Sequence, residues 1–231
     1  MQNILVCDDE RDIVKALRIY LISEGYNVIE AFDGVEALEK LKGGDIDLVI
    51  MDVMMPEKDG ITTLMEIRQQ YTVPVILLTA KSEDTDKIFG LNVGADDYIT
   101  KPFNPLEVVA RVKSLLRRVP ASVAEERPDK LINGGLEIDD REKTVRLDGE
   151  QLAFTPTEYD ILMLFMKNIG KVFSPKDIYN IVWNNEPYGS ESTVIVHIRH
   201  IREKIEIDSA HPRYIISVWG HGYKMEKRNR D

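Results

Sequence analysis

The chain has 231 residues, of which 30 are lysine or arginine and 40 are aspartate or glutamate, so its formal net charge is −10. The length suggests two domains, and a composition that is 43% apolar and 30% charged is typical of globular proteins. A single cysteine excludes a disulfide framework. We find neither a signal-peptide pattern nor an uncharged apolar run of roughly 18–20 residues, so we expect a cytoplasmic protein without a membrane partner. The acidity argues against bulk electrostatic coating of nucleic acid, but it leaves room for a small basic site.

Residues 1–118 alternate short β-rich runs with amphipathic helical stretches. The predicted strands are residues 4–7, 28–31, 48–51, 75–79 and 98–100. Between them apolar residues recur at helical spacing, as in Ile13, Leu17 and Leu21. A last helical stretch, residues 105–118, opens with Pro105, which suits a first helical position. The alternation predicts an α/β domain with a parallel sheet.

Residues 119–130 carry two prolines and mixed charge without apolar periodicity, which predicts a linker. From residue 131 to 231 the order changes, and strands come first, at residues 136–138, 144–147 and 152–154. Helices follow at residues 156–168, 175–183 and 191–205, and the chain ends in a candidate hairpin of residues 215–218 and 222–225. This pattern predicts a second domain of the α+β class.

Carboxylates gather at the C-terminal ends of two predicted strands in the first domain. Asp8 and Asp9 follow the first strand, and Asp52 follows the third. In a flavodoxin-like sheet of order 2-1-3-4-5 these strands are neighbours, so the three carboxylates would converge in the ligand crevice. They would repel one another unless a cation lies between them, and oxygen ligands favour Mg²⁺. Thr79 and Lys101 end the next two strands and would complete a site for an acyl phosphate.

Taken singly, these residues also fit ordinary roles as helix caps, a turn residue and a solvated lysine. The segments CDDE, DVMMP, LTA and KPF at four strand ends are more specific as a set, and with them residues 3–118 resemble the receiver domain of bacterial two-component response regulators. The resemblance implies that a sensor histidine kinase phosphorylates Asp52. It further implies that Asp9, Asp52 and the backbone carbonyl of Met54 bind Mg²⁺, while Asp8 holds the metal through water.

The same resemblance implies a switch. Lys101 would pair with the phosphoryl group, Thr79 would reorient to bond to it, and the rotamer of Tyr98 would follow Thr79. Met54 and Lys81 lie where the family tunes the lifetime of the phosphoryl group.

A different class, the haloacid-dehalogenase-type phosphatases, also combines an aspartate nucleophile with Mg²⁺. Those enzymes need a second aspartate two residues after the nucleophile as a general acid, and here that position is Met54. We therefore expect no turnover of external substrates, and hence no enzyme. Cys7 lies in the first strand beside carboxylates that would raise its pKa, which predicts a buried core residue rather than a reactive thiol.

Residues 87–118 carry charges of both signs, which is typical of a solvated face. The segments GADDY, EVVARV and LLRR resemble receivers of the OmpR/PhoB subfamily, which pair through this region in an isologous homodimer. The resemblance implies three cross-dimer pairs, namely Lys87 with Glu107, Asp97 with Arg111, and Asp96 with Arg118. Such pairs would set geometry more than affinity, so we expect a weak dimer until Asp52 is phosphorylated.

The predicted helix over residues 191–205 has an apolar stripe that begins at Val194. A helical wheel places four residues on the opposite face, namely Val196, Arg199, His200 and Glu203. A face with arginine, histidine and valine suits the major groove of DNA, but on this helix alone an ordinary solvated face is the simpler interpretation.

The surrounding segments TPTEYDIL, TVIVHIRHIREKI and VWGHGYK resemble the winged helix-turn-helix domain of the OmpR/PhoB family, from about residue 131 to 225. The resemblance implies binding to double-stranded promoter DNA. The recognition helix would use Thr193, His197, Arg199, His200 and Arg202, and the wing would use Ser217, Trp219 and His221.

Two positions depart from many family members, which carry Asp in place of Ile195 and Arg in place of Trp219. Tryptophan cannot supply the positive charge that suits a narrow minor groove, so it would have to pack on sugars or phosphates. The pairing of HIRHIREK with VWGHGYK is most similar to VanR-type regulators, which govern glycopeptide-resistance genes.

We therefore expect a response regulator that dimerises on phosphorylation, binds adjacent DNA half-sites and works with RNA polymerase. A phosphorylation-controlled module whose winged helix binds a partner protein is the alternative. The salt dependence of promoter binding separates the two, because phosphate contacts make affinity fall steeply with salt.

Overall fold

A computed structural model describes residues 1–80, 93–116, 130–183 and 191–229 of the chain. They belong to two compact units, Met1–Leu116 and Arg117–Asp231. Residues 119–129 of the predicted linker lie outside the described residues, and Lys130, predicted as its last residue, instead begins a strand. Within the described parts of the chain, no helix is long and apolar enough to cross a membrane.

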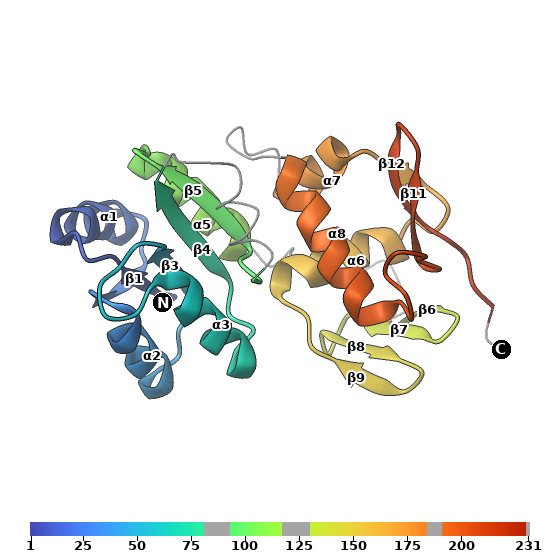
Figure 1. Cartoon of the computed structure of the whole chain (residues 1–231), viewed down its shortest axis with the longest axis horizontal. Helices are drawn as coiled ribbons and strands as arrows, with labels where there is room; N and C mark the ends of the chain where they lie inside the picture. The colour runs from blue at the N-terminus through green and yellow to red at the C-terminus, as the bar shows by residue number, and fades with distance from the viewer. Residues whose placement is uncertain (81–92, 117–129, 184–190, 230–231) are drawn as a thin grey trace. The chain divides into compact units, whose positions relative to one another are not determined.

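The first unit contains the predicted parallel sheet, in the predicted order β2-β1-β3-β4-β5 (Figure 1). Each strand extends the prediction by one or two residues, because polar flanking residues such as Asn3 and Asn27 also pair in the ladder. The bounds are β1 (Asn3–Cys7), β2 (Asn27–Ala31), β3 (Leu48–Asp52), β4 (Val75–Ala80) and β5 (Asp97–Lys101).

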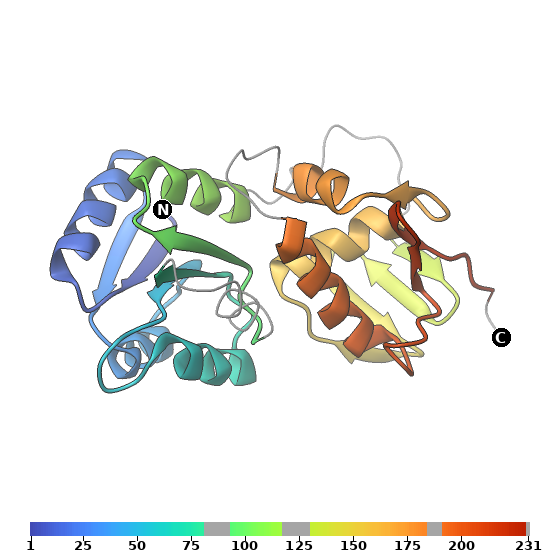
Figure 2. The ribbon, with the colours of Figure 1, turned by 45° about the horizontal axis from the view of Figure 1, so that its top comes forward.

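Helices cover both faces of this sheet, as Figure 2 shows. On one face α1 (Arg11–Ser23) packs against α5 (Pro105–Leu116), and on the other α2 (Gly34–Gly43) packs against α3 (Gly60–Gln70). The inner strands are almost wholly apolar because neither of their faces meets water. The flavodoxin-like fold predicted for this unit is therefore confirmed.

The second unit begins with a four-stranded antiparallel sheet in the order β6-β7-β8-β9. Its strands are β6 (Lys130–Asn133), β7 (Leu136–Asp139), β8 (Thr144–Leu147) and β9 (Glu150–Leu152). The last strand lies two residues earlier than predicted. The turn at Asp148 and Gly149 has positive φ at both residues, which gives a tight two-residue hairpin that pairs Glu150 directly with Leu147.

Three helices and a short sheet complete the second unit, and the winged helix-turn-helix prediction is confirmed. The helices are α6 (Pro156–Met166), α7 (Pro175–Val182) and α8 (Glu191–Ile205). The sheet has the order β10-β12-β11, formed by β10 (Val172–Phe173), which was not predicted, and by the predicted hairpin of β11 (Ile215–Val218) and β12 (Gly222–Met225). The core lies between the helices and both sheets, around Phe165, Trp183 and Ile201.

Candidate functional site

The structure brings together the three carboxylates at the ends of β1 and β3. The register pairs Cys7 with Met51, so the residues that follow, Asp8 and Asp52, emerge side by side. Asp8 and Asp52 are buried, whereas Asp9 is exposed, and one oxygen from each lies within 4.8 Å of the others. A cluster of carboxylates with one open side has the geometry to accept a divalent cation from solvent.

Lys101 completes this cluster from the end of β5. Its Nζ lies 2.8 Å from Oδ2 of Asp8 and 3.0 Å from Oδ1 of Asp52. The same ammonium lies 3.5 Å from Oε1 of Glu10, a more exposed carboxylate to which the sequence analysis gave no role. The CDDE segment contained the signal, since Glu10 follows the other acidic residues directly.

The electrostatics of the site oppose the ionised form of Asp52. Burial raises the pKa of Asp52, the hydrogen bond and charge of Lys101 lower it, and the charge of Asp8 raises it again, with a net shift upward. Burial works against the ammonium of Lys101, yet its bonds to Asp8 and Asp52 outweigh this and raise its pKa. One ammonium therefore faces several carboxylates, which leaves an excess of negative charge that a metal ion would neutralise.

The loop that follows Asp52 folds back so that its backbone contacts Asp52 and Val53. The backbone N–H of Met54 donates to Oδ2 of Asp52 at 3.2 Å, and that of Gly60 donates to the carbonyl of Val53 at 2.9 Å. A Cβ at Gly60 would lie 2.1 Å from the carbonyl oxygen of Asp52, so only glycine fits there. Gly60 was not predicted as a site residue, because nothing in its spacing reveals a close backbone approach.

Thr79 and Tyr98 lie on the neighbouring strands β4 and β5. Thr79 is buried and its hydroxyl donates to the carbonyl of Ala80 at 3.3 Å, while Tyr98 is half-buried. Tyr98 pairs with Leu77, two residues before Thr79, so both side chains lie on the same face of the sheet. Lys81 lies outside the described residues.

The interpretation of Cys7 as a core residue is confirmed. Its side chain is fully buried, and burial, followed by the charges of Asp33 and Asp8, raises the pKa of the thiol far above its usual range.

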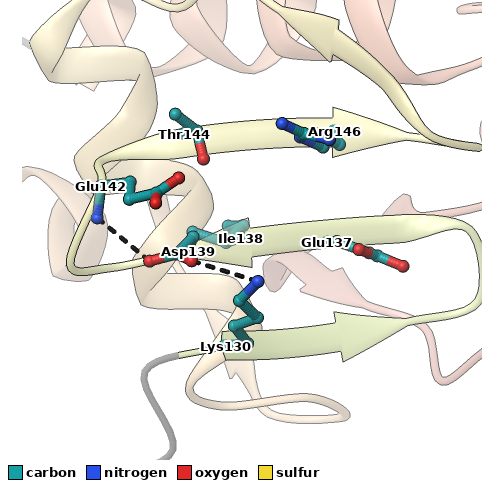
Figure 3. A pocket seen from close by; sticks show the side chains of 7 residues that line it. All are labelled: Lys130, Glu137, Ile138, Asp139, Glu142, Thr144 and Arg146. Atoms are coloured by element: carbon teal, nitrogen blue, oxygen red, sulfur yellow. Dashed lines mark hydrogen bonds and ion pairs between the residues drawn. The ribbon is translucent and has the colours of Figure 1, made fainter.

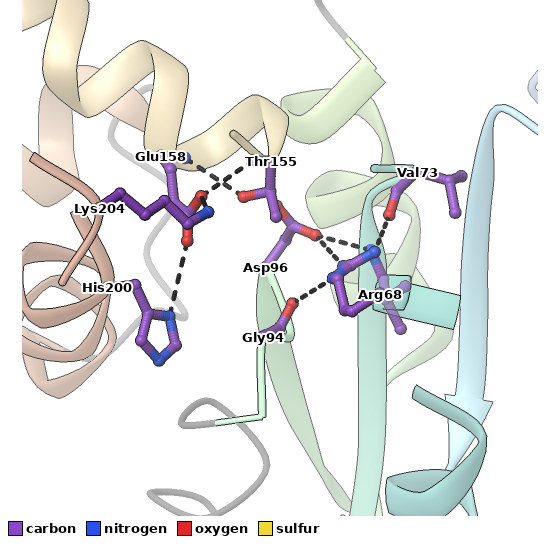
Figure 4. Close-up of polar contacts among 9 residues, drawn as sticks. Arg68, Val73, Gly94, Asp96, Thr155, Glu158, His200 and Lys204 are labelled. Carbon is purple, nitrogen blue, oxygen red and sulfur yellow. Dashed lines mark hydrogen bonds and ion pairs between the residues drawn. The ribbon is translucent and has the colours of Figure 1, made fainter. Parts of the chain in front are cut away.

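Asp96, predicted to pair with Arg118 of a partner chain, makes contacts within its own unit. It is fully buried, and its Oδ2 accepts from Arg68 Nη2 and from the backbone N–H of Val75, both at 2.9 Å (Figure 4). Arg68 also donates to the carbonyls of Gly94 and Val73. Within one chain Asp96 is therefore held by Arg68 and by the backbone of β4, and its pairing with Arg118 of a second copy stays a prediction.

Asp97, Glu107 and Arg111 also pair within one chain. Arg111 is buried and contacts Asp97 Oδ2 at 2.5 Å through Nη1 and Glu107 Oε1 at 3.1 Å through Nη2. Pairing across a dimer would require Arg111 to change partners. Lys87 and Arg118 lie outside the described residues.

Helix α8 faces the rest of its unit with residues that were predicted to contact DNA. Thr193, His197 and His200 are buried, as is Val196. The wheel placed a single apolar stripe against the core, but α8 packs against both α6 and α7, so two sides of it are covered. The exposed stripe consists of residues four apart, namely Glu191, Ile195, Arg199 and Glu203.

Arg202 joins α8 to the wing. Its Nε donates to the carbonyl of Ile215 at 2.9 Å, its Nη2 donates to the hydroxyl of Ser217 at 3.0 Å, and its guanidinium lies over the ring of Tyr223. Trp219 at the wing turn is 95% exposed, and His221 beside it is exposed as well. The wing is therefore held against α8 by Arg202 and presents Trp219 and His221 to solvent.

A small polar depression lies on the β6-β7-β8 part of the antiparallel sheet (Figure 3). Asp139 at its centre accepts from the backbone N–H of Glu142 and pairs with Lys130 at 3.4 Å. The two charges of Asp139 and Lys130 are therefore paired with each other.

Comparison with known proteins finds a family match for each of the two units. The family described as response regulator receiver domain matches residues 4–113, and the family described as transcriptional regulatory protein, C terminal, matches residues 149–225. Regulatory protein VanR of Enterococcus faecium is 43% identical, over 97% of this chain and 99% of its own length. The alkaline phosphatase synthesis transcriptional regulatory protein PhoP of Bacillus subtilis is 42% identical, over 98% and 97%.

A solved structure agrees as well. Response regulator DrrB, described as a Thermotoga maritima OmpR/PhoB homologue, is 34% identical with a TM-score of 0.52, and the match covers 98% of this chain and 99% of that one. The chain therefore belongs to the OmpR/PhoB family of two-component response regulators, which are phosphorylation-dependent transcription regulators.

Proposed function

We propose that Asp52 is the phosphoacceptor and that a sensor histidine kinase is the donor. The observation that carries this is the ammonium of Lys101, placed between Asp52 and Asp8 at 3.0 and 2.8 Å. A carboxylate oxygen of Asp52 would attack the phosphorus of the phosphohistidine, and the bond from phosphorus to imidazole nitrogen would break. Lys101 would then leave its carboxylate partners for the oxygens of the new acyl phosphate.

Asp8, Asp9 and Asp52, with the carbonyl of Met54, are the residues that would hold Mg²⁺. Their oxygens suit a hard cation, and burial together with the charge of Asp8 raises the pKa of Asp52, so a cation bound there would favour its ionised form. Bound there, the metal would neutralise charge on the phosphoryl oxygens. Thr79 would turn from the Ala80 carbonyl to the phosphoryl group, and Tyr98, on the same sheet face, would follow it.

The site supports self-modification rather than turnover. The position of a phosphatase's general acid, two residues after Asp52, holds Met54, whose side chain is 73% exposed and carries no proton to transfer. We therefore propose that the chain acts as a switch and not as an enzyme on external substrates.

Phosphorylation would favour a homodimer of receivers. Asp97, Glu107 and Arg111 would exchange their partners within the chain for partners in the second copy, with Lys87 and Arg118 adding to the interface. Because each pair lost is replaced by a similar pair, the exchange is close to neutral in energy, and a small change at Asp52 is enough to tip it. Asp96, which bonds to Arg68 within the chain, would likewise exchange partners and pair with Arg118 of the second copy.

The second unit would bind promoter DNA through α8 and the wing and act with RNA polymerase on transcription. Arg199, on the exposed stripe of α8, now pairs with Glu203 at 2.8 Å and would release it for a phosphate or a base. Ile195, which is 50% exposed, offers a methyl surface to a thymine. Ser217, Trp219 and His221 would reach the adjacent minor groove, with Arg202 positioning them.

Glycopeptide-resistance-type genes are the regulated genes that the VanR-like segments favour. PhoP is only one percentage point less identical than VanR, so overall identity does not choose between their targets. Sequencing the genomic fragments that the phosphorylated chain selects tests this assignment. Fragments dominated by unrelated promoters would contradict it.

The phosphorylation proposal is tested with acetyl phosphate and Mg²⁺ on the full chain. We expect Asp52→Ala to abolish both the mass increase and the induced dimer, while Asp12→Ala, at an exposed carboxylate on α1, retains both. Labelling of Asp52→Ala at the rate of the parent would overturn the proposal.

The DNA proposal is tested separately by measuring promoter affinity against salt. A linear fall of log affinity with log salt, with a slope of about −0.9 for each phosphate contacted, supports DNA binding. A flat response, or capture of a protein in place of DNA, would favour the protein-interaction alternative.

A further inference from the structure

A second cluster of ionisable side chains lies inside the second unit, apart from the phosphoryl site. Glu158 comes from the first turn of α6, and His197 and His200 come from α8. All three are buried, and one oxygen or nitrogen atom from each lies within 4.8 Å of the others. Two imidazoles and a carboxylate this close to one another could supply three of the four ligands of a tetrahedral metal site.

The two oxygens of Glu158 have separate roles (Figure 4). Oε2 accepts from the backbone N–H of Thr155 at 3.0 Å, as part of the capping box of α6, and from Nζ of Lys204. Oε1 faces Nδ1 of His200 at 3.6 Å. That distance is too long for a hydrogen bond but close to the roughly 3.3–3.4 Å between two ligand atoms around a tetrahedral ion with bonds of about 2.0–2.1 Å.

We propose that Glu158, His197 and His200 bind a Zn²⁺ ion that ties helix α8 to helix α6. Imidazole nitrogen with one carboxylate suits zinc, whereas Mg²⁺ and Ca²⁺ prefer sites made of oxygen alone. A water molecule would take the fourth position. The ring of Trp183, 5.8 Å from that of His197 between centroids and almost wholly buried, forms an apolar wall that keeps bulk water away.

The ammonium of Lys204 would compete with a metal ion for the carboxylate of Glu158. Without metal its ammonium supplies the positive charge that buried Glu158 requires. Its side chain is 33% exposed, so it can swing into solvent when an ion arrives. The metal would therefore replace one cation by another, and α8 would gain a bonded attachment to α6 in place of a flexible ion pair.

The chain has four histidines, and one of those outside the cluster, His211, serves as a control for the metal site. His211 also faces a carboxylate, with Nδ1 2.7 Å from Oδ2 of Asp208, but this pair is exposed and, among the described residues, no third ligand joins it. His211 thus tests whether any histidine beside a carboxylate is sufficient.

The experiment uses the full chain, stripped of metal and then kept in excess Mg²⁺ so that the carboxylates around Asp52 are occupied. Co²⁺ is titrated in as a spectroscopic probe, followed by Zn²⁺ in competition. We expect one equivalent of Co²⁺ with the absorption bands of a tetrahedral site, displaced by one equivalent of Zn²⁺. His200→Gln and Glu158→Gln should each weaken Zn²⁺ binding by at least about tenfold, since even outer partners of metal ligands contribute that much.

Lys204→Gln is the decisive variant, because it should tighten Zn²⁺ binding several-fold by removing the competing ammonium, and a misfolded protein would not gain affinity. His211→Gln should leave binding unchanged. Zinc affinity that is equal in His200→Gln and the parent, that is lost in His211→Gln, or that falls in Lys204→Gln would overturn the proposal, as would the spectrum of an octahedral ion.

Discussion

Two buried carboxylates in this chain each contact a lysine, but their surroundings differ. Asp52 shares Lys101 with Asp8 and lies beside Asp9, so negative charge is in excess. Glu158 accepts a backbone N–H of its own helix start and pairs with Lys204, so its charge is balanced. Burial alone therefore does not distinguish the two carboxylates, whereas the balance of charge around each of them does.

The position of each carboxylate in its element explains the difference. Asp52 ends a strand, where neighbouring strands bring further carboxylates to the same edge of the sheet. Glu158 lies in the first turn of α6, where the free N–H groups and the helix dipole stabilise a negative charge. The environment of Asp52 therefore works against ionisation of its carboxyl, whereas donors on α6 and Lys204 surround the carboxylate of Glu158.

Removing the carboxylate of Glu158 should cause the largest loss of stability. We expect Glu158→Ala to destabilise the second unit by about 3 kcal/mol, because it breaks the capping box and leaves Lys204 without its buried partner. Calorimetry of the full chain measures this. Glu150→Ala, at an exposed carboxylate of the same unit, should change stability by less than about 0.5 kcal/mol, and equal losses in the two variants would contradict the comparison.

Arg202 is a partly buried cation that, unlike Lys101 and Lys204, donates its hydrogen bonds to neutral acceptors. Burial lowers its pKa, and Arg202→Lys should lose the paired bonds to Ile215 and Ser217, at about 1–2 kcal/mol of stability. Arg199→Lys, at an exposed position on the same helix, is the control and should cost less than about 0.5 kcal/mol. Denaturant unfolding measures both, and a greater loss in Arg199→Lys would show that Arg202 does not hold the wing.

Removing the charge of Asp52 should change stability by a smaller amount, and in the stabilising direction. Because the pKa of Asp52 is raised in the folded chain, the ionised form works against folding, and the folded state binds more protons than the unfolded state. We expect Asp52→Asn to raise the Tm by a few degrees without metal, increasingly so as the pH rises from about 4 towards 7. A lower Tm for Asp52→Asn at pH 7 would refute this, and excess Mg²⁺ should remove the advantage.

The smallest expected signal is the reaction of the Cys7 thiol with a disulfide reagent. Its raised pKa and full burial predict that a disulfide reagent modifies the folded chain very slowly, and that the reaction becomes fast only in denaturant. Rapid modification without denaturant would show that the strand end opens near the carboxylates.

The residues whose positions follow from the sheet topology could be predicted from the sequence. Asp8, Asp52 and Lys101 each follow a recognisable apolar strand, and parallel strands bring their ends to one edge, so their meeting could be predicted. Gly60 could not, because its role depends on how close one backbone approaches another.

The exposed face of α8 was predicted less well. A helical wheel shows which residues share a side, but it does not show how many neighbours the helix has. Contact with both α6 and α7 buries His197 and His200, and the same contact creates the cluster around Glu158. The burial of Asp96 was not predicted for a similar reason, since its charge indicated a surface residue while Arg68 binds it inside.

The exposure of Trp219 gives the chain an optical reporter of its own. The only other tryptophan, Trp183, is 1% exposed against 95% for Trp219. Emission from Trp219 should therefore lie at longer wavelength and be quenched by iodide, while Trp183 emits at shorter wavelength and is shielded. Protection of the long-wavelength component by a DNA fragment would follow the wing as it binds, without any attached dye.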